Sequence, residues 1–317
     1  MRIAFGLRDK AMQRCSALLC AGLTVLCIAS CRSQSLAPSQ QVPPSAGQRA
    51  DNWPDALNDF RFRWSVGDDF DLATGWAVPL RAYLESFLIN GYMNNLDGGY
   101  PGFQRAAPEA VERGSHEWSE LPNSVKRLRG SVEFGDEHLR VIGNEDLHVL
   151  RVEPLAHGFR AFVCDATFNV YKQAGDSKQV LPLYLASSAA TNADFHNMRV
   201  WRTEFSNQGF LAGGADAPTV PQRGPLPAPQ ADVFGPWYVT GSERVSLWSD
   251  HDHPDVKPGS PEAEQYFHDA QTREDGMREE CLIHYPLNAA ERTKRATTVL
   301  DGLPTVQPAI PGWPDEG

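Results

Sequence analysis

The segment from residue 159 to residue 171 constrains the fold more than any other part of this chain. Apolar side chains recur at every second position, which predicts a β-strand with one apolar face. That face comprises Phe162, Cys164, Ala166, Phe168 and Val170. The other face becomes polar midway, at Asp165 and Asn169. At about 3.3 Å per residue the strand would be about 43 Å long, so we expect it to belong to a strongly bent sheet.

Further segments show the same alternation of apolar and polar side chains. They are residues 131–134, 139–142, 147–152, 180–186 and 198–205, and strand character returns at 237–248. Turn residues such as Gly143 and Asn144 separate neighbouring segments, and several connections are short enough for hairpins. The pattern therefore predicts a mainly antiparallel sheet.

Helical patterns lie before and after these strands. Apolar residues repeat at helical spacing in residues 77–93, and a second short helix is predicted over 108–113. Further on, Ser260 is typical of an N-cap, and Asn288 begins a capping box on a helix that we expect to end at Asp301. The chain is therefore predicted to be an α+β protein, with N-terminal helices packed on a bent sheet and a C-terminal helical, proline-rich extension.

Composition sets the expected boundaries within this fold. The α+β core is predicted over 52–211 and a strand–helix extension over 237–302. Between them, residues 212–236 are so rich in proline and glycine that no regular element can form, so we expect a linker or long loop. Prolines recur again in 303–317, which predicts an extended tail.

The order of these elements resembles the cone-shaped fold of the nuclear transport factor-like superfamily. The resemblance covers about residues 70–210 and rests on element order, without a shared motif. It implies helices that wrap over a curved sheet and leave a pocket at its wide end, a fold that exported actinobacterial proteins often use. An all-β sandwich with appended helices is the competing fold.

The N-terminal segment has the order of an export signal. Basic residues precede an apolar run over 15–28, which is shorter than the roughly 20 residues that a membrane-spanning helix needs. The sequence Ile28-Ala29-Ser30-Cys31 then resembles the lipobox of bacterial lipoproteins. This resemblance implies that residues 1–30 are removed and that a lipid on Cys31 anchors the protein on the outer face of the cell membrane. An ordinary cleaved signal and an uncleaved anchor are the alternatives.

The segment after the lipobox has almost nothing to bury. Residues 32–50 are polar and proline-rich, so 31–51 is expected to be a disordered tether. Of the six cysteines, three lie in the signal and Cys31 would carry the lipid, which leaves Cys164 and Cys281. Two cysteines in an oxidising compartment predict one disulfide, and two buried free thiols are the alternative.

One short segment has the residues of a metal site. His251, His253 and Asp255 alternate, so on an extended chain they would point the same way and could bind one zinc ion. The order resembles that of metallo-β-lactamase-type hydrolases, whose motif continues with His where this chain has Val256. A polar loop without metal is the alternative.

Two sets of residues are candidates for ligand binding. Asp165 and Asn169 could line a pocket if the sheet curls, with Asp165 as a base. The alternative is that this face of the strand meets solvent or pairs with Arg199 or Arg202. Trp237 and Trp248 could form an aromatic platform for carbohydrate, although aromatic residues in strands more often fill a core.

The charge of the chain limits its partners. A formal net charge of −11 argues against nucleic acid and against a polybasic membrane contact, so attachment would rest on the lipid. We therefore expect a non-enzymatic envelope lipoprotein that binds an envelope component or a partner protein and needs no cofactor. The alternatives are an exported hydrolase, with zinc at His251 and His253, and a carrier of a small apolar ligand.

Overall fold

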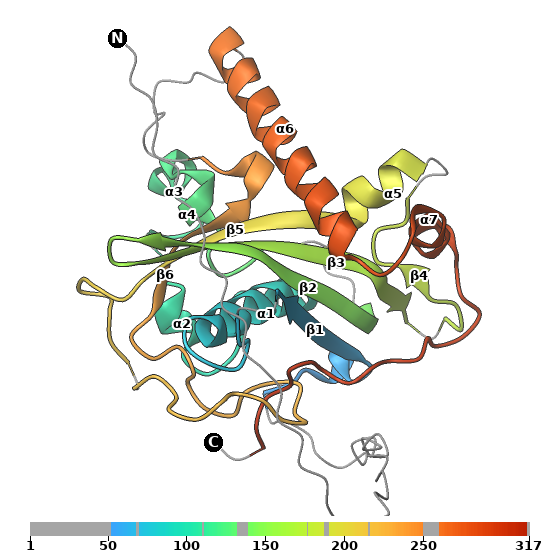
Figure 1. Cartoon of the computed structure of the whole chain (residues 1–317), viewed down its shortest axis with the longest axis horizontal. Coiled ribbons are helices and arrows are strands. Elements are labelled where there is room, and N and C mark those ends of the chain that lie inside the picture. The colour runs from blue at the N-terminus through green and yellow to red at the C-terminus, as the bar shows by residue number, and fades with distance from the viewer. Residues whose placement is uncertain are drawn as a thin grey trace, which may run out of the picture. The chain divides into compact units, whose positions relative to one another are not determined.

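A computed structural model describes residues 52–67, 70–109, 111–131, 139–175, 177–186, 190–214, 216–249 and 260–315 of the chain. The fold in Figure 1 combines helices with a six-stranded mixed sheet that does not close on itself. The predicted α+β class is therefore confirmed.

The strands are ordered so that only one neighbouring pair is parallel. Along the sheet they are β1 (Phe60–Val66), β2 (Leu139–Leu155), β3 (Gly158–Ala174), β5 (Met198–Ser206) and β6 (Tyr238–Arg244), and the short β4 (Leu181–Pro182) also pairs with β3. β1 runs parallel to β2, and every other pairing is antiparallel. The sheet is thus mainly antiparallel, as the alternation predicted.

The predicted turn at Gly143 and Asn144 is wrong, because β2 continues through it. Gly143 has a φ of 114°, and a Cβ atom there would collide with the carbonyl oxygen of Asn169 in β3. The β2–β3 register also shifts after Asn144 and again after Val149. These irregularities bend the two long strands where the sequence suggested a break.

Helix α1 (Ala77–Met93) has the predicted bounds and is buried along almost its whole length. It lies on one face of the sheet in Figure 1. Tyr83 packs edge-on against Phe205 with ring centroids 5.8 Å apart, and Phe87 packs against Trp201 at 5.1 Å, which places the helix against β5. Because its other sides are covered as well, α1 is an internal helix rather than an amphipathic surface helix.

The remaining helices are shorter, except for α6. They are η1 (Asp55–Leu57), α2 (Phe103–Ala106), α3 (His116–Glu120), α4 (Asn123–Lys126), α5 (Ala190–Asn197), η2 (Val245–Leu247), α6 (Pro261–His284) and α7 (Ala289–Thr297). The helix predicted over 108–113 is wrong, since the described residues there are not helical. Pro108 disfavours helical geometry at the residue before it, which accounts only for the end of α2 at Ala106.

Two other predicted elements are shorter than expected. The strand predicted over 180–186 is reduced to β4, where Pro182 has no N–H to donate to the ladder. The helix predicted to end at Asp301 ends at Thr297, because Leu300 instead exchanges backbone hydrogen bonds with Val180 at 2.9 and 3.0 Å. Most of the strand predicted over 131–134 lies outside the described residues.

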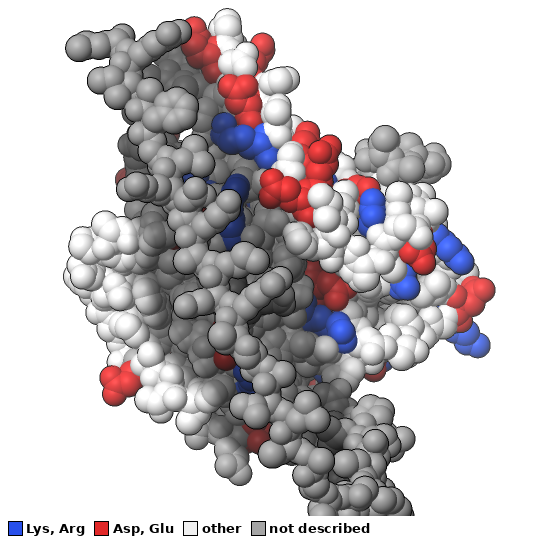
Figure 2. All heavy atoms as spheres, viewed as in Figure 1, with Lys and Arg blue, Asp and Glu red and all other residues white. Residues whose placement is uncertain are grey.

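The two predicted C-terminal helix starts are confirmed. The Ser260 side chain accepts the N–H of Ala263, and Asn288 and Glu291 form a reciprocal capping box. The buried residues of α6 are Ala263, Ala270, Glu274, Arg278 and Cys281, and Arg278 donates to the backbone carbonyl of Met198 at the start of β5. Several acidic side chains lie along the visible side of α6 in Figure 2, among neutral and basic ones, as is usual for a solvated helix face.

The sheet separates the two larger of three hydrophobic clusters among the described residues, the third being formed by Ile142, Tyr171 and Val180. The larger lies on the α1 side and contains Val163 of β3. The smaller contains the predicted apolar face of β3 up to Phe168, packed against Cys281 and Ala296 from α6 and α7. Val170 belongs to the larger cluster instead, because the register shift near Asn144 changes which side of the sheet it faces.

The two proline-rich segments pack against α1 through a buried ion pair. Arg81 donates to the carbonyl oxygens of four loop residues, Leu72, Gln222, Pro311 and Gly312. Glu85 accepts hydrogen bonds from Trp64, Tyr100 and Trp313 at 2.7 to 2.8 Å. The residues expected to form a loop and a tail therefore contribute to the larger cluster, and Trp313 is only 1% exposed.

Candidate functional site

A buried charged centre formed by Glu145, Asp165 and Arg199 lies between α1 and the sheet. Each residue comes from a different strand, and Asp165 stands directly opposite Arg199 in the β3–β5 register. Both carboxyl side chains are completely buried, and Arg199 is 6% exposed. Charged groups at this depth are stable only when they are paired and hydrogen-bonded, so the three residues depend on one another.

One oxygen of Asp165 receives most of the contacts. Its Oδ2 accepts Nε of Arg199 at 3.0 Å and Nε1 of Trp201 at 2.8 Å, and Nη2 of Arg199 lies 2.8 Å away. The same Nη2 lies 3.7 Å from Oε1 of Glu145. The guanidinium is therefore fixed mainly by Asp165, with Glu145 as a more distant neighbour.

Glu145 differs from Asp165 in its electrostatic environment. Burial raises the pKa of Glu145 well above its ordinary value, and the charge of Asp165 and a hydrogen bond with it raise that pKa further. Arg199 and the hydroxyl of Tyr92, which donates to Oε2 at 2.7 Å, oppose the shift only in part. Glu145 therefore tends to keep its proton, so that one cation compensates one carboxylate.

Two aromatic rings hold the Arg199 side chain in place. Its Nη1 donates to the hydroxyl of Tyr184 at 2.9 Å. The guanidinium carbon lies 5.0 Å from the ring centroid of Tyr184 and 5.7 Å from that of Trp201. Arg199 is thus oriented in advance of any ligand.

A pocket of about 330 Å³ adjoins this centre and is called the Arg199 pocket below. Its apolar lining is Phe87 of α1, Phe195 of α5, Trp201 of β5 and Leu247 of η2. Its charged and polar lining includes Arg127, Tyr184, His196, Arg199, Glu243 and Arg244. This volume is at the lower end of the range for small-molecule pockets, and the mixed lining suits a ligand with both an apolar and a polar part.

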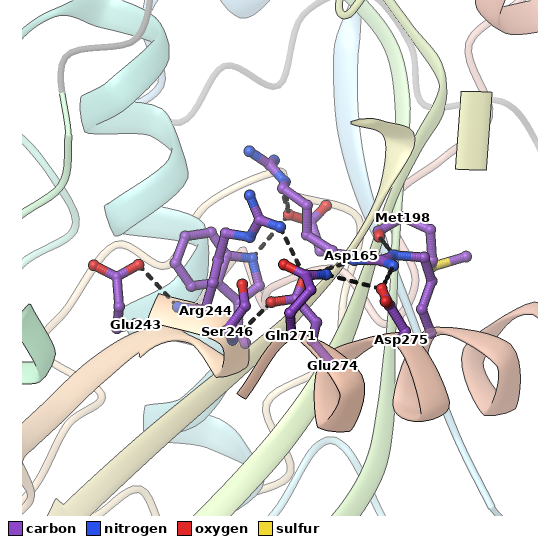
Figure 3. A network of polar contacts seen from close by, with 11 residues as sticks. Asp165, Met198, Glu243, Arg244, Ser246, Gln271, Glu274 and Asp275 are labelled. Atoms are coloured by element: carbon purple, nitrogen blue, oxygen red, sulfur yellow. Dashed lines mark hydrogen bonds and ion pairs between the residues drawn. The ribbon is translucent and has the colours of Figure 1, made fainter. Parts of the chain in front are cut away.

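A second ionic network positions Arg244 at the wall of the pocket. Figure 3 shows Glu274 of α6 between Arg244 and Asp275, close to Ser246. Glu274 accepts Nη2 of Arg244 at 2.7 Å, Nη2 of Arg278 at 2.9 Å and the backbone N–H of Ser246 at 2.8 Å. Burial opposes ionisation, but the charge of Arg244 and these hydrogen bonds lower the pKa of Glu274. The network therefore fastens α6 to β6 and η2.

The ligand-binding residues expected from the sequence do not form a single site. Asp165 pairs with Arg199, as one alternative had it, and the other alternative, contact with solvent, is wrong because Asp165 is buried. The same burial keeps it from touching a ligand. Asn169 instead donates to Asp146 at 3.3 Å and to the hydroxyl of Tyr285 at 3.1 Å. Of Asp165 and Asn169, only Asp165 is connected with the Arg199 pocket, because it orients Arg199, which lines that pocket.

The two tryptophans also lie in separate environments. Trp237 packs against Phe159 with ring centroids 5.1 Å apart. Trp248 is 6% exposed, and the guanidinium carbon of Arg202 lies 3.8 Å from the centroid of its ring. The two rings have different packing partners, and no contact between them is seen among the described residues.

The predicted disulfide is present. Cys164 of β3 and Cys281 of α6 are bonded to each other, which is the pairing that the cysteine count indicated. A second pocket, also of about 330 Å³, lies over this disulfide and is lined by Ser65, His148 and His284. The Ser65 hydroxyl lies 2.9 Å from Nδ1 of His148, its neighbour in the β1–β2 register. The contact between Ser65 and His148 follows from strand pairing alone. The Arg199 pocket is the stronger candidate for a ligand-binding site, because it adjoins the buried charged centre.

The other predicted sites cannot be placed. Cys31, His251, His253 and Asp255 lie outside the described residues. Within the described ranges, no group of three or more His, Cys, Asp or Glu side chains is arranged to hold a metal ion. No helix among those same residues is both long enough and apolar enough to cross a membrane.

Comparisons with protein-family models, with curated proteins and with solved structures gave no match to this chain. The likeness to the nuclear transport factor-like superfamily therefore stays a prediction. The fold and the site define only a class, an α+β protein with a ligand-sized pocket beside a buried arginine.

Proposed function

We propose that this chain is a lipid-anchored, extracytoplasmic binding protein that holds a small molecule in the Arg199 pocket. Cys31 is the anchor, residues 31–51 are the tether, and the described residues form the binding domain. The observation that carries the binding role is a ligand-sized pocket beside an arginine that is already oriented by Asp165 and by two aromatic rings.

Burial of the two carboxyl groups favours binding over acid–base catalysis. A general acid or base must come within hydrogen-bond reach of the proton that it transfers. Glu145 and Asp165 are 0% exposed, so a ligand in the pocket would contact Arg199 and Trp201 instead. The carboxyl groups therefore serve to orient Arg199. The charged lining also suits a polar ligand better than the wholly apolar cargo of a carrier.

Two features support the extracytoplasmic location. A disulfide between Cys164 and Cys281 fits an oxidising compartment. The order of charge, apolar run and small residues before Cys31 fits a lipoprotein signal. The acidic net charge of −11 leaves the lipid as the means of membrane attachment.

The anchor is tested by labelling cells with radioactive fatty acid and separating their membranes. We expect label and membrane association in the wild type, and neither in a Cys31→Ser variant. Equal labelling of the two proteins would refute the anchor.

The binding role is tested by native mass spectrometry of the protein purified from its own cells. Leu247 lines the pocket and is 41% exposed, so a Leu247→Trp substitution fills the pocket without disturbing the core. We expect a small molecule on the wild type and its loss from this variant at an unchanged melting temperature. The same occupancy in both proteins, or none in either, contradicts the proposed role.

A further inference from the structure

The three arginines of the pocket differ in how far their charges are already compensated. Arg199 is paired with Asp165, and Arg244 is paired with Glu274. Arg127, at the C-terminal end of α4, is exposed, and its guanidinium makes no hydrogen bond or ion pair with another described residue. Arg127 is therefore the cation of the pocket wall that a ligand can engage at little cost.

Glu243 is the acidic residue among the described lining residues, and its surroundings weaken its charge. It is 7% exposed, and its Oε1 accepts the backbone N–H of Arg244 at 2.9 Å. Burial raises the pKa of Glu243, and the charges of Arg127 and Arg244 oppose that shift, whereas Glu274 adds to it. Once protonated, Glu243 can donate a hydrogen bond, and the pocket wall then carries an excess of positive charge.

The apolar part of the lining complements this charge. Phe195 is 38% exposed and Leu247 is 41% exposed, so both present apolar surface that a ligand could cover. Trp201 and Phe87 close the inner side, with their rings 5.1 Å apart. These side chains offer apolar surface to a planar group that binds in the pocket beside the arginines.

We propose that the Arg199 pocket selects an organic carboxylate, with its carboxylate on Arg127 and a planar apolar group against Phe195 and Leu247. This inference rests on the proposed binding function and names the class of ligand. A guanidinium matches a carboxylate in shape and charge, and it repels an ammonium group. Selection by charge at this site contrasts with the acidic character of the whole chain, whose net charge is −11.

Three ligands that share one ring system test this assignment by isothermal titration calorimetry on the mature protein. Indole-3-acetate carries a carboxylate, indole-3-acetamide is neutral, and tryptamine carries an ammonium group. We expect the acetate to bind about tenfold more tightly than the amide, the effect of one charge-assisted hydrogen bond. We expect tryptamine to bind more weakly than either.

Three variants separate charge selection from general binding. Arg127→Ala should remove the tenfold preference for the acetate, whereas Phe195→Ala should weaken the acetate and the amide by a similar factor. Arg223→Ala is the matched control, because this arginine is exposed, pairs with Asp71 and does not line the pocket. It should change neither affinity.

The outcomes distinguish the ligand class from the binding function. If the amide or tryptamine binds as tightly as the acetate, and Phe195→Ala weakens the binding of that ligand, the pocket binds small molecules but the carboxylate assignment is wrong. If none of the three ligands binds, the assignment is also refuted, and the Leu247→Trp comparison decides the binding function separately. A preference that survives in Arg127→Ala places the charge selection elsewhere and overturns the role of Arg127.

Discussion

The buried Arg81–Glu85 pair should be a main determinant of stability, and an Arg81→Met substitution tests this. Arg81 is completely buried, and burial lowers its pKa only to about 10, so the side chain is a cation at neutral pH. Its guanidinium carbon also lies 4.1 Å from the ring centroid of Trp313. Methionine would fill the space, but it would leave Glu85 without its cation and four loop carbonyls without their donor.

The expected loss follows from the cost of leaving one member of a buried ion pair uncompensated. That cost is about 3–5 kcal/mol. In a domain of this size each kcal/mol corresponds to about 2–4 °C, so the melting temperature should fall by about 6–20 °C. Arg81→Lys should lie between the wild type and Arg81→Met, because lysine keeps the charge but cannot span the same carbonyl groups.

Differential scanning calorimetry and limited proteolysis measure the two expected effects. Calorimetry should show the graded loss of stability, and the loop 212–236 and the C-terminal residues 303–315 should become the first sites of cleavage. Arg223→Met serves as a control, since its side chain is 61% exposed and its loss should cost less than about 1 kcal/mol. Equal stability of Arg81→Met and this control would refute the reasoning.

Three further predictions concern Glu145, the disulfide and the metal ligands expected from the sequence. Because burial and the charge of Asp165 raise the pKa of Glu145 above 4.5, the wild type should lose stability as the pH rises from about 4.5 towards that pKa. Over that pH range, the free energy of unfolding of Glu145→Gln should rise relative to that of the wild type by up to about 1.4 kcal/mol per pH unit. Urea titrations that give parallel curves of stability against pH for the two proteins would contradict this. Replacing Cys164 and Cys281 by serine should cost about 4–5 kcal/mol, measured by denaturant unfolding, and a smaller effect than 1 kcal/mol would exclude the disulfide as a major constraint. Metal analysis of the purified protein should find no stoichiometric zinc, and zinc that disappears in a His251→Ala/His253→Ala variant would instead support the hydrolase alternative.

The sequence predicted the elements whose pattern is local. Residues 77–93 show helical spacing, and the helix has those bounds. The N-caps at Ser260 and Asn288 depend on contacts within one turn, so both were visible as well. The alternation in 198–205 likewise gave β5 within one residue at its C-terminal end.

The errors arose where distant segments decide the local structure. Gly143 reads as a turn residue, but the close approach of Asn169 makes it a bend inside β2. β1 is a different case, because Phe60, Phe62 and Trp64 alternate with polar residues and this local strand signal was overlooked; only its parallel pairing with β2 is decided at a distance. A parallel neighbour leaves no hairpin signal in the sequence.

The site was predictable only in part for the same reason. Pairing of Asp165 with Arg199 was one alternative, because two strands with opposite charges can meet in register. Glu145 and Arg127 gave no comparable signal, since each acquires its role from strands or helices far away in the chain. The Arg81–Glu85 spacing of four residues is common on exposed helices, and only the burial of α1 shows that this pair holds two proline-rich segments.

The central claim is that a small molecule occupies the Arg199 pocket of this protein, and a crystal structure of the protein purified from its own cells tests it most directly. We predict electron density for one small molecule between Phe195 and Leu247, with its polar end next to Arg127. A pocket that contains only ordered water, or a molecule bound elsewhere in the domain, would contradict the account.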